Sequence, residues 1–258
     1  MNTIVVLSII LFLLMVSIGG KKGIRAFMAL IVNFIILIIS IFIMLDPTSD
    51  PIIITIIAST AISFITLFYI SEMNSTTKMA FFSTIVTVVI LIFFIMMVTE
   101  KAMVQGFGEE EIGELLIFNL HIGIDFVKLG TSVVIISAIG AITDITISIA
   151  APMREIFYHH PTIKRKELFH LGLNIGRDIL GTNSNTLFFA FFGGYLALLI
   201  WFKDLAYSIE EIINSKVFTA EMLTILCAGI GIALAIPITS WFTANYLIKS
   251  REKENISK

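Results

Sequence analysis

The residue best suited to chemistry in this sequence is a carboxylate inside an apolar segment. Asp144 is the only Asp, Glu, Lys or Arg in the segment 129–151. If that segment is an α-helix, Asp144 lies about seven residues, or about 10 Å, from its nearer end. A carboxylate at such a depth costs about 2.5–3.5 kcal/mol on insertion scales, so it faces protein or water and commonly carries a proton or a cation. The sequence therefore predicts a protonatable or ion-coordinating site at Asp144.

Small and polar residues share a helix face with Asp144, because they are spaced by three, four or seven residues. This face holds Ser137, Gly140, Ala141, Asp144, Ser148 and Ala151. A stripe of this kind also suits close helix packing, in which Asp144 is held only by hydrogen bonds. Both interpretations stay open from the residues alone.

A second polar stripe follows across a short basic turn. It contains Asn174, Asp178, Gly181, Thr182 and Asn185 at helical spacing, with Arg177 beside it. Because consecutive membrane helices run antiparallel, we expect Thr182 and Asn185 at the depth of Ser148 and Asp144, where the four would form a proton, ion or substrate site. We expect Asn174, Arg177 and Asp178 at its cytoplasmic mouth, although a plain surface ion pair would explain the two charges equally well.

Glycines and one proline mark expected contacts between helices. Gly140, Gly181, Gly193 and Gly194 are candidates for close helix packing or for a hinge. Pro237 removes a backbone hydrogen bond and should kink its helix, which would free carbonyls for an ion or for a nearby hydroxyl.

Several kinds of chemistry lack their signatures. The sequence contains no HExxH, Walker A, GxSxG or CxxC motif, and its histidines are not at a zinc-binding spacing. We therefore expect no enzymatic activity, no bound metal and no cofactor. The basic residues come without a nucleic-acid-binding motif, so lipid headgroups are a better explanation for them than nucleic acid.

The elements that carry these residues are membrane helices. The chain has 258 residues, 57% of them hydrophobic, and a mean hydropathy of +1.00, far more apolar than a soluble domain of this length. We predict an all-α polytopic membrane protein, a single membrane domain over residues 1–258. A span needs about 20 mostly apolar residues. Seven segments qualify, at about 2–18, 26–45, 52–70, 80–98, 129–151, 181–201 and 219–248.

Basic residues predict the orientation of these helices. All but four of the 17 Lys and Arg residues fall in the loops after the first, third and fifth segments and in the tail. Basic loops stay in the cytoplasm. The pattern therefore places the helices in the cell membrane, with the N-terminus outside the cell and the C-terminus in the cytoplasm.

The motif G-A-I-x-D-x-x-x-S-I-A at 140–150, followed by N-I-G-R-D-I-x-G-T-x-x-N-T at 174–186 and the pair Gly193-Gly194, resembles the YibE/F-like family of bacterial multipass membrane proteins. The family signature carries over at Gly140, Asp144, Ser148, Asn174, Gly176, Arg177, Asp178, Gly181, Thr182, Asn185 and Thr186. The resemblance implies a cell-membrane protein often accompanied by a second, similar subunit, and it supplies no established activity.

Two hypotheses of function follow. In the first, the chain is a transporter or permease subunit that is coupled to protons or cations through Asp144. In the second, it is a non-transporting subunit whose small-residue stripes bind a paralogous partner or a second copy. An intramembrane enzyme ranks third, because a lone acid without a metal or a nucleophile is a poor catalytic set.

Overall fold

The computed structural model describes residues 3–102 and 125–256, and every regular element among them is a helix. The helices are α1 (Thr3–Met44), α2 (Pro51–Phe64), the π-helix η1 (Ile65–Tyr69), α3 (Ser75–Ala102), α5 (Phe126–His159), α6 (Arg165–Gly194), α7 (Leu196–Asp204), α8 (Ile209–Asn214) and α9 (Lys216–Ile256). The all-α prediction is confirmed for these residues.

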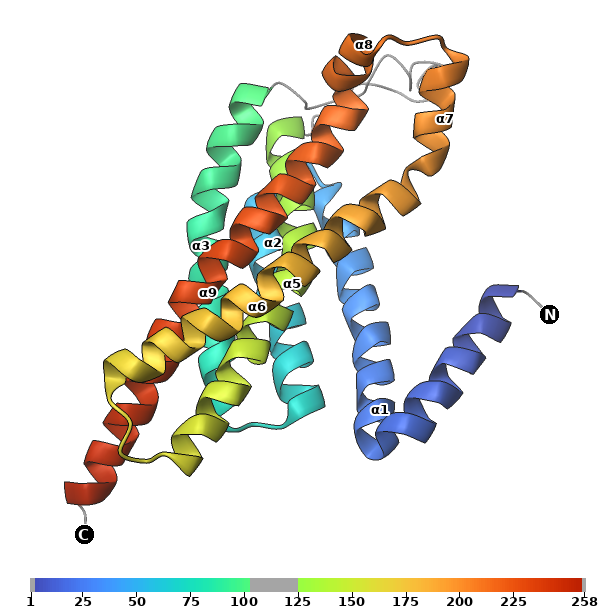
Figure 1. The fold of residues 1–258 in the computed structure, drawn as a ribbon. Coiled ribbons are helices and arrows are strands. Elements are labelled where there is room, and N and C mark those ends of the chain that lie inside the picture. Colours follow the sequence, from blue (N-terminus) through green and yellow to red (C-terminus); the bar gives the residue numbers. More distant parts are fainter. Residues whose placement is uncertain (1–2, 103–124, 257–258) are drawn as a thin grey trace.

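Helix α5 is the centre of the molecule, where it packs against α3, α9, α2 and α6 (Figure 1). One face of α5 carries Ile142, Ile145 and Ile149, all fully buried. Buried aliphatic residues of α3 and α9 complete this core. The repeat of three and four residues along α5 thus separates an apolar buried face from the opposite face, which carries Asp144.

Hydroxyl groups join the helices inside this core. Thr84 of α3 and Thr146 of α5 share a hydrogen bond of 2.9 Å between their Oγ1 atoms. The Oγ of Ser63 on α2 lies 3.4 Å from the Oγ1 of Thr143 on α5. Because the hydroxyls of Thr84 and Thr146 each have a single proton, one of the two donates across the pair and the other donates to a carbonyl of its own helix, so both hydroxyls are satisfied although they are buried.

The first two expected segments, at about 2–18 and 26–45, lie on the two arms of α1, which are separated by a kink at Gly20. Gly20 interrupts the helical backbone of α1 with φ 54° and ψ −130°, a conformation that residues with a Cβ rarely adopt. Just beyond it, a Cβ on Gly23 would lie 1.7 Å from the carbonyl oxygen of Met15, so the two arms of α1 approach each other through glycine.

Within residues 3–102 and 125–256, five helices are long and apolar enough to cross a membrane, and the bent pair α6 and α7 makes six. The sequence predicted seven spans. The number here is smaller because α1, a helix of 42 residues whose arms contain the first two predicted segments, is counted as one span. The expected span 181–201 also begins too late, since α6 starts at Arg165 and ends at Gly194, where the chain turns by 50° into α7. The polar first half of α6 is helical because it packs on α9, as described below.

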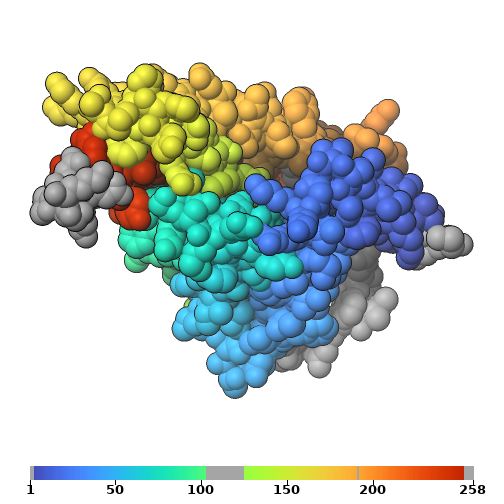
Figure 2. Space-filling view, turned by 90° about the horizontal axis from the view of Figure 1, so that it is seen from below, coloured from blue at the N-terminus to red at the C-terminus, as the bar shows by residue number. Residues whose placement is uncertain are grey.

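Basic residues gather at one end of the molecule, which we call the basic end. It holds the bend of α1, the turn between α5 and α6, and the last turns of α9 (Figures 1 and 2). Its described basic residues include Lys21, Lys22, Arg25, Lys164, Arg165, Lys166, Lys249 and Arg251. Arg25 pairs with Glu72 at 2.7 Å, and Arg251 donates to the carbonyls of Pro161 and Ile163, which fastens α9 to the turn before α6.

Candidate functional site

Asp144 lies on the exposed side of α5, opposite the buried isoleucines. Its carboxylate makes no hydrogen bond or ion pair with any other residue that the structure describes. Ser148, one turn further along, is also exposed and without such a partner. The apolar residues of α5 turn inward to meet α3 and α9, and this arrangement directs the polar stripe to the surface of the chain.

A groove begins at the same stripe. It has a volume of about 560 Å³ and separates the second arm of α1 from α5, with Ser137 and Gly140 on the α5 side. Asn33 lines the opposite wall, where its amide donates to Thr66 at 3.1 Å while its carbonyl oxygen is buried without a partner among the described residues. Gly140 is one helical turn from Asp144, so this groove and the carboxylate occupy neighbouring stretches of one surface.

The polar stripe of α6 also lies on an exposed side. Asn174, Arg177, Asp178, Gly181, Thr182 and Asn185 are all exposed. Thr182 donates to the carbonyl of Ile179 at 3.0 Å, a bond within its own helix. Arg177 reaches Asn174 at 3.4 Å, so two of the three residues expected at the mouth are neighbours, whereas Asp178 has no ion-pair partner in the described chain.

The two stripes are not joined in the structure. No hydrogen bond links Asp144 or Ser148 to Thr182 or Asn185 across residues 3–102 and 125–256. The expected four-residue site therefore has no direct hydrogen bond between its two halves in the described chain. The orientation of α6 about its own axis decides where its polar stripe points. The contacts made by the opposite face of α6 determine that orientation.

That opposite face carries two glycines that sequence reasoning did not select for packing. A Cβ on Gly172 would lie 2.6 Å from both Met153 Sδ and Ser240 Oγ, and one on Gly176 would lie 2.3 Å from Ile236 Cγ2. Glycine therefore permits α6 to contact α9 and the end of α5 closely. The signal was present in the sequence, because Gly172 and Gly176 form a GxxxG pattern.

The glycines expected at helix contacts are open instead. Apart from the adjoining turns of the same helix, no atom of the described residues lies within 4 Å of a Cβ built on Gly140, Gly181, Gly193 or Gly194. These positions do not pack within the chain, although Gly193 and Gly194 immediately precede the bend into α7. Pro237 lies inside α9, which continues as a helix on both sides of it, and the nearby Thr239 hydroxyl is buried without a partner among the described residues.

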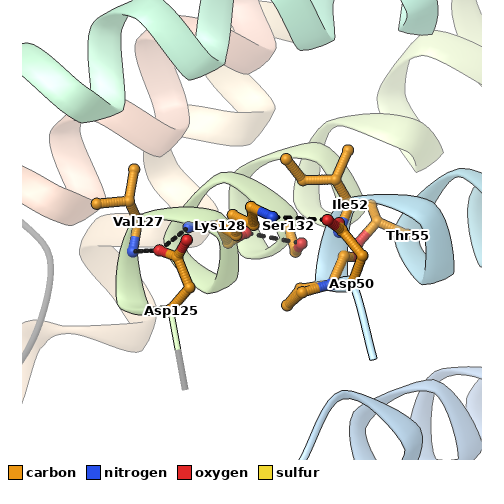
Figure 3. A network of polar contacts seen from close by, with 8 residues as sticks. Asp50, Ile52, Thr55, Asp125, Val127, Lys128 and Ser132 are labelled. Atoms are coloured by element: carbon orange, nitrogen blue, oxygen red, sulfur yellow. Dashed lines mark hydrogen bonds and ion pairs between the residues drawn. The ribbon is translucent and has the colours of Figure 1, made fainter. Parts of the chain in front are cut away.

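A polar network whose ion pair was not predicted lies at the opposite end of the molecule from the basic end (Figures 1 and 3). Asp50 caps α2 by accepting from the amide of Ile52 at 2.9 Å, and it accepts from Lys128 Nζ of α5 at 2.6 Å. Asp125 caps α5 through the amides of Val127 and Lys128. The hydrogen bond from Lys128 holds the pKa of Asp50 below its usual value. The available signal was Asp50 directly before Pro51, a common helix start.

In the part of the chain that the structure describes, no group of three or more His, Cys, Asp or Glu side chains is placed to hold a metal ion. The exposed carboxylate of Asp144 can accept a proton or contribute one ligand to a cation, and the other polar groups are hydroxyls on both stripes and amides on the α6 stripe. The carboxylate cannot surround a cation by itself.

Comparisons with known proteins agree with the motifs. The family model described as YibE/F-like protein matches residues 7–249, nearly the whole chain. No curated protein and no solved structure gives a significant match. Together with helices long and apolar enough to span a bilayer, the match identifies a membrane protein. This chain belongs to the YibE/F-like family.

Proposed function

We propose that this chain is a subunit of a membrane transport complex and that Asp144 carries a proton or a cation where α5 meets a partner subunit. One observation supports this most directly: Asp144 is exposed on a central helix and has no polar partner in the described chain. Lipid cannot solvate that carboxylate, because burial in hydrocarbon costs about 2.5–3.5 kcal/mol on insertion scales.

A partner subunit would supply the missing surroundings. Ser148 on α5, with Thr182 and Asn185 on α6, offers hydroxyl and amide oxygens on exposed faces. A polar helix of a similar chain laid over these faces would bring its own oxygens to Asp144 and exclude lipid. The partner is a paralogous subunit or a second copy of this chain, and the substrate enters between the subunits. Asn174, Arg177 and Asp178 then lie at the inner mouth.

The complex resides in the cell membrane in this proposal, with the N-terminus outside and the C-terminus in the cytoplasm. The gathering of Lys and Arg at the basic end supports this orientation. Each arm of α1 crosses the bilayer separately, which gives seven crossings. The chain has no enzymatic role and needs no cofactor in this scheme.

A second candidate is a non-transporting subunit that only binds a partner. The open space around Gly140 and Gly181 favours it, because exposed glycines on a membrane helix let a neighbouring helix approach closely. In this case Asp144 would hydrogen-bond to the partner and would carry nothing.

Ion flux in proteoliposomes separates the two candidates. We would reconstitute the chain with and without its paralogous partner and record proton and cation uptake, comparing wild type with Asp144→Asn and Asp144→Glu. Transport predicts flux that is lost in Asp144→Asn and partly kept in Asp144→Glu, while the subunits still copurify. Asp204→Asn is the matched control, since Asp204 is an exposed carboxylate at the end of α7, away from both stripes.

Two results would refute the transport proposal. One is unchanged flux in a folded Asp144→Asn protein. The other is loss of copurification in Asp144→Asn without any flux in the wild-type complex, which would establish the structural role instead.

A further inference from the structure

An open groove of about 740 Å³ lies at the basic end, between α3 and the last turns of α9, with the start of α6 at its edge. Its lining combines four aromatic side chains with two cations. These residues are Phe82, Trp241, Phe242, Tyr246, Arg165 and Lys249. The groove is remote from the stripes of Asp144 and Asn185, which contribute nothing to its lining.

The aromatic residues form an ordered wall. Phe82 of α3 meets Phe242 of α9 edge to face, with ring centroids 4.8 Å apart, and Trp241 contacts the same ring at 4.8 Å. The wall is nevertheless open, since Phe82 is 51% and Trp241 is 49% exposed. Such a surface suits the glycerol region and upper acyl chain of a lipid, where Trp and Tyr gather in membrane proteins.

The two cations are free to bind an anion. Arg165 and Lys249 are both exposed, and neither side chain forms an ion pair or hydrogen bond with another described residue. One carboxylate, Glu252, shares the groove, so these groups carry one net positive charge. A guanidinium can donate two parallel hydrogen bonds to a phosphate, and an ammonium adds a point charge.

The order of these groups along α9 matches the layers of a bilayer. Helix α9 has 41 residues, or about 62 Å, twice the hydrocarbon thickness of about 30 Å, so it emerges from the membrane. Lys249 follows Trp241 by about 12 Å along the helix axis, in the direction of the C-terminus. Aromatic rings at the hydrocarbon boundary and cations at headgroup depth are therefore aligned in one groove.

We propose that this groove binds one anionic phospholipid. Arg165 and Lys249 hold its phosphate, and the wall of Phe82, Trp241 and Phe242 holds its glycerol region and the upper part of an acyl chain. The lipid would contact α3, α6 and α9 together, because residues of all three helices line the groove. This site is independent of the proposed transport function.

Fluorescence quenching by brominated lipids tests the proposal. The chain has two tryptophans, so Trp201→Phe leaves Trp241 as the only tryptophan reporter inside the groove. We would reconstitute that protein in nanodiscs of phosphatidylcholine with increasing brominated phosphatidylglycerol, and separately with brominated phosphatidylcholine. The expected result is a preference of about fivefold for the anionic lipid near Trp241, the scale of one net charge at the membrane surface.

Charge variants decide whether the groove itself causes the preference. The double substitution Arg165→Gln with Lys249→Gln should remove the preference for the anionic lipid. Glu252→Gln should increase this preference, and an increase could not result from misfolding. Lys21→Gln with Lys22→Gln is the matched control, because these exposed lysines lie at the same end but outside the groove. Equal quenching by both lipids, or a preference that survives Arg165→Gln with Lys249→Gln, would overturn the proposal.

Discussion

Asp50 serves two purposes that substitution can separate. Its carboxylate caps α2 through the amide of Ile52 and pairs with Lys128 of α5 at 2.6 Å. Asp50→Ala removes both, whereas Asp50→Asn keeps a capping oxygen and removes only the charge, because Asn caps helices as well as Asp. The two variants should therefore differ in the free energy of unfolding.

The magnitudes follow from the exposure of the pair. Loss of an N-cap costs about 1 kcal/mol, within a range of about 0.5–2 kcal/mol. The side chain of Asp50 is 35% exposed, so solvent screens the ion pair, and its loss should cost only about 0.2–1 kcal/mol. We expect Asp50→Ala to destabilise by about 1–2 kcal/mol and Asp50→Asn by about 0.5 kcal/mol.

Equilibrium unfolding in mixed micelles, titrated with a denaturing detergent, measures both values. In a Lys128→Met background, Asp50→Asn should have no further effect. Equal destabilisation by Asp50→Asn and Asp50→Ala would refute the capping role, and an unchanged effect of Asp50→Asn in Lys128→Met would refute the pairing.

The pH dependence has a defined sign. The hydrogen bond from Lys128 lowers the pKa of Asp50 in the folded state. An ionised Asp50 therefore stabilises the fold above its unfolded pKa of about 3.9, and this contribution is lost as the pH falls through the folded pKa. The difference between wild type and Asp50→Asn should shrink only below about pH 4.

Three further predictions concern packing and backbone. Gly176→Ala should destabilise by about 1–3 kcal/mol through overpacking against α9, whereas Gly140→Ala should leave the isolated chain unchanged or stabilise it by up to about 1 kcal/mol; unfolding in mixed micelles compares the two. Gly20→Ala should change the angle between the arms of α1, because alanine disfavours the backbone there; spin-label distances between the arms report it. Thr146→Val should cost about 0.5–1.5 kcal/mol by removing the interhelical hydrogen bond to Thr84, whose hydroxyl keeps the carbonyl of Ala80 as a partner, again measured by unfolding.

Each of these has an outcome that contradicts it. Equal stability of Gly176→Ala and Gly140→Ala would mean that α6 does not approach α9 through glycine. An unchanged distance between the arms in Gly20→Ala would place the bend elsewhere. If Thr146→Ser, which keeps the hydroxyl, is as unstable as Thr146→Val, the lost methyl group rather than the hydrogen bond explains the effect.

The membrane helices were predictable because hydrocarbon thickness demands long apolar runs, and 80–98, 129–151 and 219–248 all lie inside observed helices. The predicted helix boundaries were wrong where a helix contains a polar stretch. The first half of α6 is polar, yet its glycines pack on α9, so the helix starts well before its apolar part. The break at Gly20 lies between the first two expected segments, which end at about 18 and begin at about 26, whereas its backbone dihedral angles were not predictable, since hydropathy does not report them.

For the candidate site, the sequence predicted which residues share a helix face, but not how the two faces are placed relative to each other. Spacing correctly groups Asp144 with Ser148, and Thr182 with Asn185, because helical periodicity determines which residues share a face. It does not determine which neighbour a face meets. That choice depends on the shape of the opposite face, where Gly172 and Gly176 permit a contact with α9.

The glycine contact of α6 also restricts how the molecule can move. Asn174 and Gly176 are two residues apart, so they point about 160° apart around the helix. Turning α6 to aim its polar stripe at α5 would replace Gly176 with larger side chains against Ile236, where even a Cβ lies too close. Any working motion that keeps this contact must therefore tilt or slide α6 and α9 as a rigid pair, rather than roll α6 about its axis.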